Sequence, residues 1–158
     1  MFLIDGYNLL HVVLKAEESS GAANDLELCR VLSRYLVQIG TPGVIIFDGA
    51  GPPDKSGFDD LQNLEILFAG LGADADSAIE DKISASTAPK RLTVVSSDRR
   101  LRKAARARKC TSLKSEAFWE NVRRQLSRKR PVSEPAGKRL GLSESETDKW
   151  LDAFGLGR

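Results

Sequence analysis

Three apolar, strand-like segments of this sequence each end in an aspartate. MFLID ends at Asp5, VIIFD at Asp48 and LTVVSSD at Asp98. In a parallel α/β sheet, the carboxyl ends of the strands open onto one edge, where ligands bind. Carboxylates gathered there repel one another unless a positive charge lies between them, and a divalent cation is the simplest source of that charge. The pattern therefore predicts metal-assisted hydrolysis, although each aspartate alone also fits an ordinary turn or helix N-cap.

A fourth acidic segment, ADADSAIED at residues 73–81, has the spacing of a helix start. If the helix begins near Asp76, Glu80 lies on the same face four residues later, and Asp74 lies just before the helix. Mg²⁺ and Mn²⁺ take oxygen ligands and keep several waters, so a few carboxylates suffice to hold one. The alternative is a solvated acidic helix start favoured by the helix dipole. The candidate metal ligands are Asp5, Asp48, Asp76, Glu80 and Asp98.

The segment 98–109 is strongly basic and has helical periodicity. Its small apolar residues, Leu101, Ala104 and Ala105, fall on one side and suit packing against a sheet. The other side carries Arg99, Arg102, Lys103 and Arg106. This cationic stripe would bind phosphates beside the metal site in a sequence-independent, salt-sensitive way, unless it is only a solvated face. Basic residues that could extend the stripe are Arg123, Arg124, Arg128, Lys129 and Arg130.

The charge of the chain is divided unevenly between its two halves. Residues 1–81 carry 4 basic and 14 acidic residues, whereas residues 82–158 carry 20 basic and 8 acidic residues. The net charge of +2 conceals this asymmetry. An acidic half suited to metal ions and a basic half suited to a polyanion agree with a nucleic-acid substrate.

Apolar and polar periodicity predicts alternating strands and helices. This order implies right-handed βαβ units and a three-layer α/β/α sandwich with a central, mostly parallel sheet. The expected strands cover residues 1–5, 44–47, 64–68, 92–95 and 110–113. The expected helices cover residues 8–15, 24–39, 76–89, 98–109 and a last core helix that Ser115 would cap.

The C-terminal part of the sequence is expected to be separate from this domain. The length of 158 residues suits one domain with a short appendage. We expect a nuclease-like domain over residues 1–130 and a tail over 131–158, with a linker at 131–137. The tail helix would dock on the core or bind a partner through Trp150, Leu151 and Phe154. A homodimer is permitted but not required.

Several function classes are excluded by missing residues. The single histidine, His11, rules out RNA cleavage by two histidines, and we interpret it as a packing residue. The GxxxxGK[ST] motif and the GxSxG motif are both absent. No apolar run is long enough for a membrane helix, and no signal peptide is recognisable. Because Cys29 and Cys110 lack ligand-like spacing, we expect buried thiols in a reduced, cytoplasmic protein.

Four blocks of the sequence together resemble the NYN domain of the YacP-like group, which is related to PIN-type nucleases. They are Asp5-Gly-Tyr-Asn8, Phe47-Asp48-Gly49, Ala75-Asp76 with Glu80, and Ser96-Ser97-Asp98 with Arg99. The resemblance covers roughly residues 1–126. It implies a PIN-like fold, dependence on Mg²⁺ or Mn²⁺, and endoribonuclease activity, with translating mRNA at the ribosome as one candidate substrate.

The resemblance also implies roles for individual residues. Asp5, Asp76 and Asp98 match the metal-binding acidic positions, with Asn8 and Asp48 beside them. Asp74 departs from the pattern, because the group usually has a hydroxyl residue there.

Our hypothesis is a metal-dependent endoribonuclease that leaves a 5′-phosphate and a 3′-hydroxyl. The catalytic set would be Asp5, Asn8, Asp76 and Asp98. The RNA-binding set would be Ser97, Arg99, Arg102, Lys103 and Arg106. One rival is a non-catalytic RNA- or ribosome-binding module. A phosphotransfer or phosphatase domain is a weaker rival, because DGYN lacks the second aspartate that such sites usually have.

Overall fold

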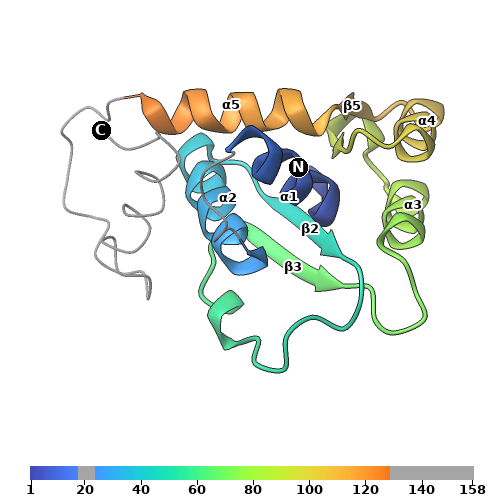
Figure 1. Ribbon diagram of the computed structural model, residues 1–158. Helices are drawn as coiled ribbons and strands as arrows, with labels where there is room; N and C mark the ends of the chain where they lie inside the picture. The colour runs from blue at the N-terminus through green and yellow to red at the C-terminus, as the bar shows by residue number, and fades with distance from the viewer. Residues whose placement is uncertain (18–23, 129–158) are drawn as a thin grey trace.

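The computed structural model describes residues 1–17 and 24–128, which form a five-stranded parallel sheet with helices on both faces (Figure 1). The strands are β1 (Phe2–Asp5), β2 (Gly43–Phe47), β3 (Leu64–Phe68), β4 (Thr93–Val95) and β5 (Thr111–Leu113). The helices are α1 (Gly6–Ala16), α2 (Asp25–Ile39), α3 (Ala75–Ala85), α4 (Arg99–Ala107) and α5 (Ser115–Ser127). Short 3₁₀ turns, η1 (Ser56–Phe58) and η2 (Pro89–Arg91), complete the described elements. The predicted α/β/α sandwich is confirmed.

Side-chain alternation along the strands separates the interior into two cores. Ile4, Ile45 and Val95 face a core formed with α1, α2 and α5. Leu3 and Ile46 face the opposite way, into a core formed with α3 and α4. Because a strand buried on both faces loses the polar half of its pattern, β2 is apolar and buried throughout.

The order of the strands is β3-β2-β1-β4-β5, and all neighbouring pairs are parallel. The chain moves from β1 outward through β2 to β3, then returns to the other side of β1 for β4 and β5. This reversal makes β1 the topological switch point, and such sheets bind ligands in the crevice at the carboxyl ends beside it. Asp5 is the last residue of β1 and therefore lies at that crevice.

Local sequence explains most boundaries. Asn24 caps α2 by accepting a hydrogen bond from the backbone N–H of Glu27 at 3.0 Å, and Gly40 ends the helix with a φ of 67°. Helix α3 begins at Ala75 with Asp74 as its N-cap and ends at Ala85, before the predicted end near Pro89. The chain leaves the helix at Ser86, whose backbone is extended, three residues before Pro89.

Two further predictions are wrong in detail. Ser115 is the first residue of α5 and does not cap it, because Lys114 holds the N-cap position without a side-chain hydrogen bond. His11 is exposed and is not a packing residue. The prediction of buried thiols is confirmed, since Cys29 and Cys110 are both free and buried.

The predicted linker, tail helix and domain boundary after residue 130 lie outside the described residues. Within residues 1–17 and 24–128, no helix combines the length and the apolar character needed to cross a bilayer.

Candidate active site

Asp5 is the buried centre of the carboxyl edge, with only 7% of its surface exposed. Its carboxylate accepts hydrogen bonds from the hydroxyl of Ser96 at 3.0 Å and from the backbone N–H of Asn8 at 3.5 Å. Burial raises the pKa of Asp5 to about 6, opposed by the hydrogen bond from Ser96 and reinforced by the negative charges of Asp76 and Asp48. Asp5 is therefore a carboxylate whose charge is poorly compensated by the protein.

The other edge aspartates are positioned by helix starts. Asp98 caps α4, and its carboxylate accepts the backbone N–H groups of Arg100 at 2.8 Å and Leu101 at 3.2 Å. Asp48 follows β2 and accepts the first N–H of α3, from Ala75, at 2.7 Å. Asp76 lies in the first turn of α3. Free N–H groups and the helix dipole thus hold the carboxylates at the edge.

The four aspartates interact with one another across elements. Partial burial raises the pKa of Asp76, and the charges of Asp98 and Asp48 raise it further. Asp5 in turn interacts with Asp76 and Asp48. The fold therefore brings together the predicted residues Asp5, Asp48, Asp76 and Asp98, which we call the acidic edge.

The donor chemistry of the acidic edge fits a hard divalent cation, because carboxylate oxygens are what Mg²⁺ and Mn²⁺ prefer. Mutual repulsion of the carboxylates would be relieved by such an ion. In the described part of the chain, no group of three His, Cys, Asp or Glu side chains is arranged closely enough to hold a metal ion. Mg²⁺ keeps several waters and needs only one or two direct carboxylate ligands, so this arrangement is compatible with the ion.

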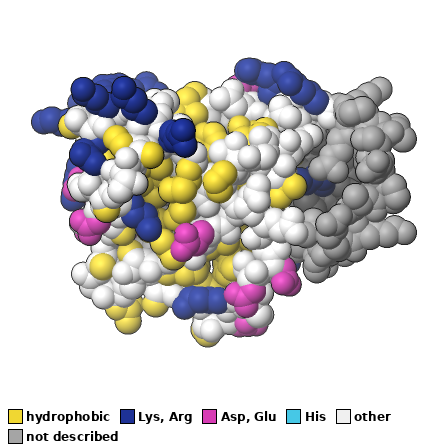
Figure 2. All heavy atoms as spheres, turned by 180° about the vertical axis from the view of Figure 1, so that it is seen from behind, with side chains coloured by type: hydrophobic (Ala, Val, Ile, Leu, Met, Phe, Trp, Pro, Cys, Tyr) yellow, Lys and Arg dark blue, Asp and Glu magenta, His cyan; other side chains and the backbone are white. Residues whose placement is uncertain are grey.

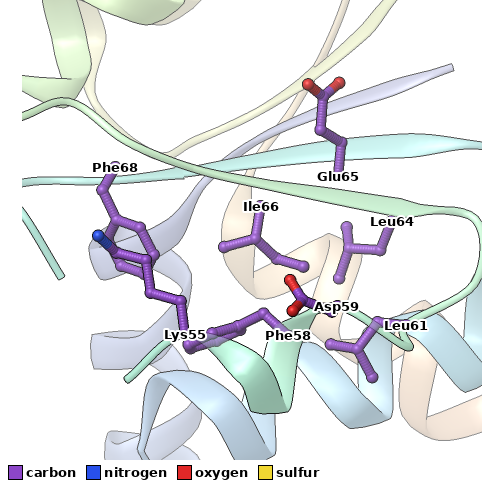
Figure 3. Close-up of a pocket in the computed structure, with 8 residues that line it drawn as sticks. All are labelled: Lys55, Phe58, Asp59, Leu61, Leu64, Glu65, Ile66 and Phe68. Carbon is purple, nitrogen blue, oxygen red and sulfur yellow. The ribbon is translucent and has the colours of Figure 1, made fainter. Parts of the chain in front are cut away.

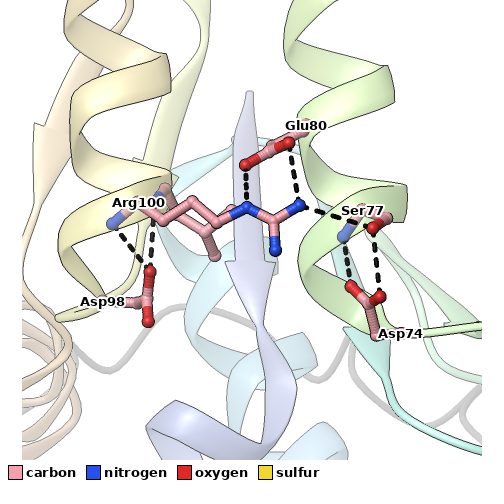
Figure 4. Close-up of polar contacts among 6 residues, drawn as sticks. Asp74, Ser77, Glu80, Asp98 and Arg100 are labelled. Carbon is pink, nitrogen blue, oxygen red and sulfur yellow. Dashed lines mark hydrogen bonds and ion pairs between the residues drawn. The ribbon is translucent and has the colours of Figure 1, made fainter.

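Glu80 and Asp74 have other partners (Figure 4). The guanidinium of Arg100 on α4 forms an ion pair with Glu80 on α3 and a hydrogen bond with the hydroxyl of Ser77 at 3.5 Å. Asp74 accepts hydrogen bonds from the backbone N–H and hydroxyl of Ser77, which lower its pKa. Glu80 therefore links α3 to α4, and Asp74 caps the start of α3. Sequence reasoning missed Arg100, although its spacing to Ala104, four residues on, placed it on the side that faces α3.

A hydrogen-bond network fixes Asn8 beside Asp5. The side-chain oxygen of Asn8 accepts from the backbone N–H of Ser97 at 3.0 Å and from the hydroxyl of Ser115 at 2.6 Å. The hydroxyl of Ser97 donates to Glu116 and accepts the backbone N–H of Ser115 at 3.1 Å. Ser97 was predicted to contact RNA, but here its hydroxyl links the chain before α4 to the start of α5. The sequence carried no signal for the contact between Ser115 and Asn8, because the two residues lie 107 positions apart.

Sequence reasoning also missed Ser96. Its side chain is fully buried. While its hydroxyl donates to Asp5, the same oxygen accepts the backbone N–H of Asp98 at 3.1 Å. The Ser96 hydroxyl therefore forms hydrogen bonds with both Asp5 and Asp98, two residues of the acidic edge.

The basic residues of α4 are accessible to a ligand. Leu101 and Ala105 are buried as predicted, whereas Arg99, Lys103 and Arg106 are exposed and Arg102 is half-buried. Figure 2 shows Lys and Arg side chains gathered at two separate places along the upper rim of one face. The cationic stripe of α4 begins directly after Asp98, the N-cap of the helix and a member of the acidic edge.

The predicted extension of this stripe along α5 is not continuous. Helix α5 packs on the opposite face of the sheet from α4. It also begins at the carboxyl edge, so its basic end points away from the aspartates. Arg123 contacts Glu17 at 3.6 Å, and Arg124 and Arg128 are exposed. Lys129 and Arg130 lie outside the described residues.

A separate hollow of about 270 Å³ lies between β3 and η1 (Figure 3). Phe58 and Phe68 contact each other edge to face, and the ammonium of Lys55 lies 5.5 Å from the centre of the Phe68 ring. None of the four edge aspartates lines this hollow. It is therefore distinct from the acidic edge.

Comparison with known proteins agrees with this geometry. Residues 2–152 match the model of the YacP-like NYN domain. The chain belongs to the YacP-like NYN domain family. The match confirms the resemblance found in the four sequence blocks, and it extends beyond the residues that carried that resemblance. Family membership implies a PIN-like nuclease.

Solved structures support the fold of this NYN domain. A crystal structure of Rae1 (YacP) from Bacillus subtilis is similar with a TM-score of 0.60 and 19% identity, covering 79% of this chain and 74% of that chain. A mutant of the same protein gives a TM-score of 0.55 and 18% identity, covering 78% of this chain and 75% of that chain. At this level of identity the similarity concerns the fold alone. No curated protein matches the sequence significantly.

Proposed function

We propose that this NYN domain is a metal-dependent endoribonuclease. The observation that carries the proposal is the acidic edge: four carboxylates from separate segments interact at the topological switch point, and two of them have raised pKa values. Such a cluster costs stability unless it serves a cation, and the family implies nuclease chemistry. Asp5, Asp76 and Asp98 would hold Mg²⁺ or Mn²⁺, in part through bound water, with Asp48 beside them.

The metal ion and the basic residues of α4 would have different roles toward the substrate. The bound ion would supply an activated water and neutralise charge on the phosphate and the leaving oxygen. Asp98 places the N-terminus of α4 next to the acidic edge, so Arg99 and Lys103 can hold the RNA backbone beside the scissile bond. Arg106, one turn further along α4, would contact a neighbouring phosphate.

The substrate and setting are narrower proposals. An acidic site flanked by a cationic helix suits a polyanion bound without base recognition, so we propose single-stranded RNA, with ribosome-associated mRNA as the candidate in the cell. Two free cysteines fit a reducing compartment such as the cytoplasm.

Cleavage of a labelled RNA in Mn²⁺, Mg²⁺ or EDTA tests the proposal. We expect metal-dependent cutting that leaves a 5′-phosphate, and we expect Asp76→Asn to reduce its rate by about 100-fold or more, because loss of even an indirect metal partner costs 10–100-fold. Asp81→Asn is the matched control, since Asp81 is an exposed carboxylate on the same helix.

Three results would count against the nuclease. They are undiminished cutting in EDTA, a 2′,3′-cyclic product, and equal activity of Asp76→Asn and wild type. RNA binding without cutting in either metal would favour the rival, a non-catalytic RNA- or ribosome-binding module.

A further inference from the structure

The side-chain amide of Asn8 has a defined orientation. Its two ends look alike in shape but differ in chemistry: the oxygen only accepts hydrogen bonds and the nitrogen only donates them. A backbone N–H can only donate, so the atom that faces the N–H of Ser97 must be the oxygen. The hydroxyl of Ser115 donates to the same oxygen. Both lone pairs of the Asn8 oxygen are therefore occupied by the protein itself.

The nitrogen of the same amide remains available. No residue in the described part of the chain accepts a hydrogen bond from it, and it is not among the buried unpaired atoms. Asn8 lies beside Asp5, whose carboxylate accepts the backbone N–H of Asn8. Asn8 thus presents two N–H donors at the acidic edge and no free acceptor.

This polarity selects the ligand. A cation needs an oxygen lone pair, and the lone pairs of Asn8 are taken, so Asn8 is not suited to be a metal ligand. Two N–H donors fixed in a water-accessible site bind an anionic oxygen. The four aspartates of the acidic edge repel a phosphate, whereas the amide nitrogen of Asn8 beside them attracts one.

We infer that Asn8 binds a non-bridging oxygen of the scissile phosphate, and that Ser115 is a positioning residue that keeps the amide in this orientation. The inference rests on the proposed function for the identity of the anion. Ser115 is fully buried at the first residue of α5, and its backbone N–H is held by the hydroxyl of Ser97. If the amide flipped, its nitrogen would face the backbone N–H of Ser97, which can only donate. The Ser115 hydroxyl adds a second hydrogen bond to the oxygen in the present orientation and holds the side chain against Ser97.

NMR of the side-chain amide tests the binding step without requiring catalysis. The two Asn8 resonances are assigned by their loss in Asn8→Asp, and Ca²⁺ replaces Mg²⁺ to slow any cleavage. We expect single-stranded RNA to shift the Asn8 amide signals, whereas Ca²⁺ alone leaves them nearly unchanged. An equal shift with Ca²⁺ alone, or no shift at saturating RNA, would overturn the inference.

Variants test the same point from the opposite direction. Asn8→Asp keeps acceptors for Ser97 and Ser115 but replaces the donors with a negative oxygen. We expect the Mn²⁺ affinity to be retained or raised and the melting temperature of the metal-free protein to fall, because a further carboxylate lies beside Asp5. We expect kcat/KM to fall about 100-fold, the cost of losing one oxyanion donor. Retained activity together with tighter Mn²⁺ binding would show that Asn8 is a metal ligand.

The role of Ser115 is tested by coupling. We expect Ser115→Ala to lower kcat by roughly 10-fold in the wild type, without changing Mn²⁺ affinity, and to have no effect on activity in an Asn8→Ala background. Ser115→Thr keeps the hydroxyl and should restore the rate if the variant folds. A loss of kcat of the same size in both backgrounds would reveal a purely structural role.

The two proposals fail in different ways. RNA-dependent shifts of the Asn8 amide without any cleavage would retain the phosphate contact and defeat the nuclease. Metal-dependent cleavage without these shifts would defeat only the role of Asn8.

Discussion

The buried charge of Asp5 should lower the free energy of unfolding by a measurable amount. Its folded pKa of about 6 lies above the ordinary value of 3.8, so the folded state binds the proton more tightly than the unfolded state does. By linkage, the metal-free protein loses stability as the pH rises from about 4 to about 6, and the penalty is constant above that window. The difference in pKa corresponds to about 3 kcal/mol at most.

We therefore expect Asp5→Asn to raise the free energy of unfolding of the metal-free protein at pH 7.5, by about 1–3 kcal/mol. The gain should disappear near pH 4, where aspartate is protonated in both states. Chemical denaturation in EDTA across this pH range measures the effect, with the exposed Asp81→Asn as control. Lower stability of Asp5→Asn at every pH would mean that the carboxylate is needed for folding.

Gly6 has a packing role that the sequence did not indicate. A Cβ at this position would lie 2.4 Å from the ring of Phe47 and 2.8 Å from the carbonyl oxygen of Ile46. We expect Gly6→Ala to lower the free energy of unfolding by about 1–3 kcal/mol through overpacking. Adding Phe47→Leu should cost less in this variant than in the wild type, which a double-mutant cycle checks. Simple additivity of the two substitutions would contradict the clash.

At the scale of elements, the acidic edge is a set of helix starts. Asp5 precedes α1, Asp98 caps α4, and Asp48 binds the first N–H of α3. This placement was predictable, because strands that end in Asp and are followed by helices bring carboxylates to one edge whatever the details of packing. Asparagine keeps the capping oxygen and removes the charge, so Asp→Asn tests the proposed catalysis with less effect on helix stability than Asp→Ala.

The partners of other side chains depend on how elements pack, which periodicity does not encode. Glu80 and Asp76 share a helix, yet Glu80 pairs with Arg100 of the neighbouring helix. The sequence predicted Ser115 as an N-cap because serine commonly caps helices. Its hydroxyl instead donates to Asn8 of α1, a helix that is far away in the sequence but adjacent in the fold. Contacts between helices that are far apart in sequence were therefore not predicted.

Helix α4 should provide phosphate contacts that are independent of RNA sequence. We expect Lys103→Gln with Arg106→Gln to weaken the binding of several unrelated single-stranded RNAs by similar factors. The slope of log affinity against log salt should fall by about 1–2. The control is Lys90→Gln with Arg91→Gln, which removes the same charge from η2, before β4 and thus at the other end of the sheet. An equal loss in the control would indicate a general charge effect.

For the whole molecule, periodicity predicted the order of strands and helices because each helix packs on a sheet that demands apolar residues at regular spacing. The positions of β1 to β5 agree with the expected segments to within one or two residues. The short turn η1 inside the loop after β2 was not predicted, because Gly and Pro mark a loop without specifying its path.

A bound cation should stabilise the entire domain by mass action. At 100 times its dissociation constant, Mn²⁺ would add about 2.7 kcal/mol, equivalent to a rise in Tm of several degrees for a domain of this size. We expect this rise in the wild type and a much smaller one in Asp76→Asn, measured by thermal unfolding with Mn²⁺, Mg²⁺ or EDTA. An unchanged Tm in millimolar Mn²⁺ and Mg²⁺ would contradict a strong metal site.

The helix starts at the carboxyl edge also restrict how this fold can drift in evolution. A lineage that abandoned catalysis would no longer need charge at positions 5 and 98, yet it would still need a side-chain oxygen there to begin α1 and α4. We expect such lineages to accept Asn, Ser or Thr at these positions and to reject large apolar residues. Loss of activity would then appear in sequences as a conservative exchange of acid for amide or hydroxyl.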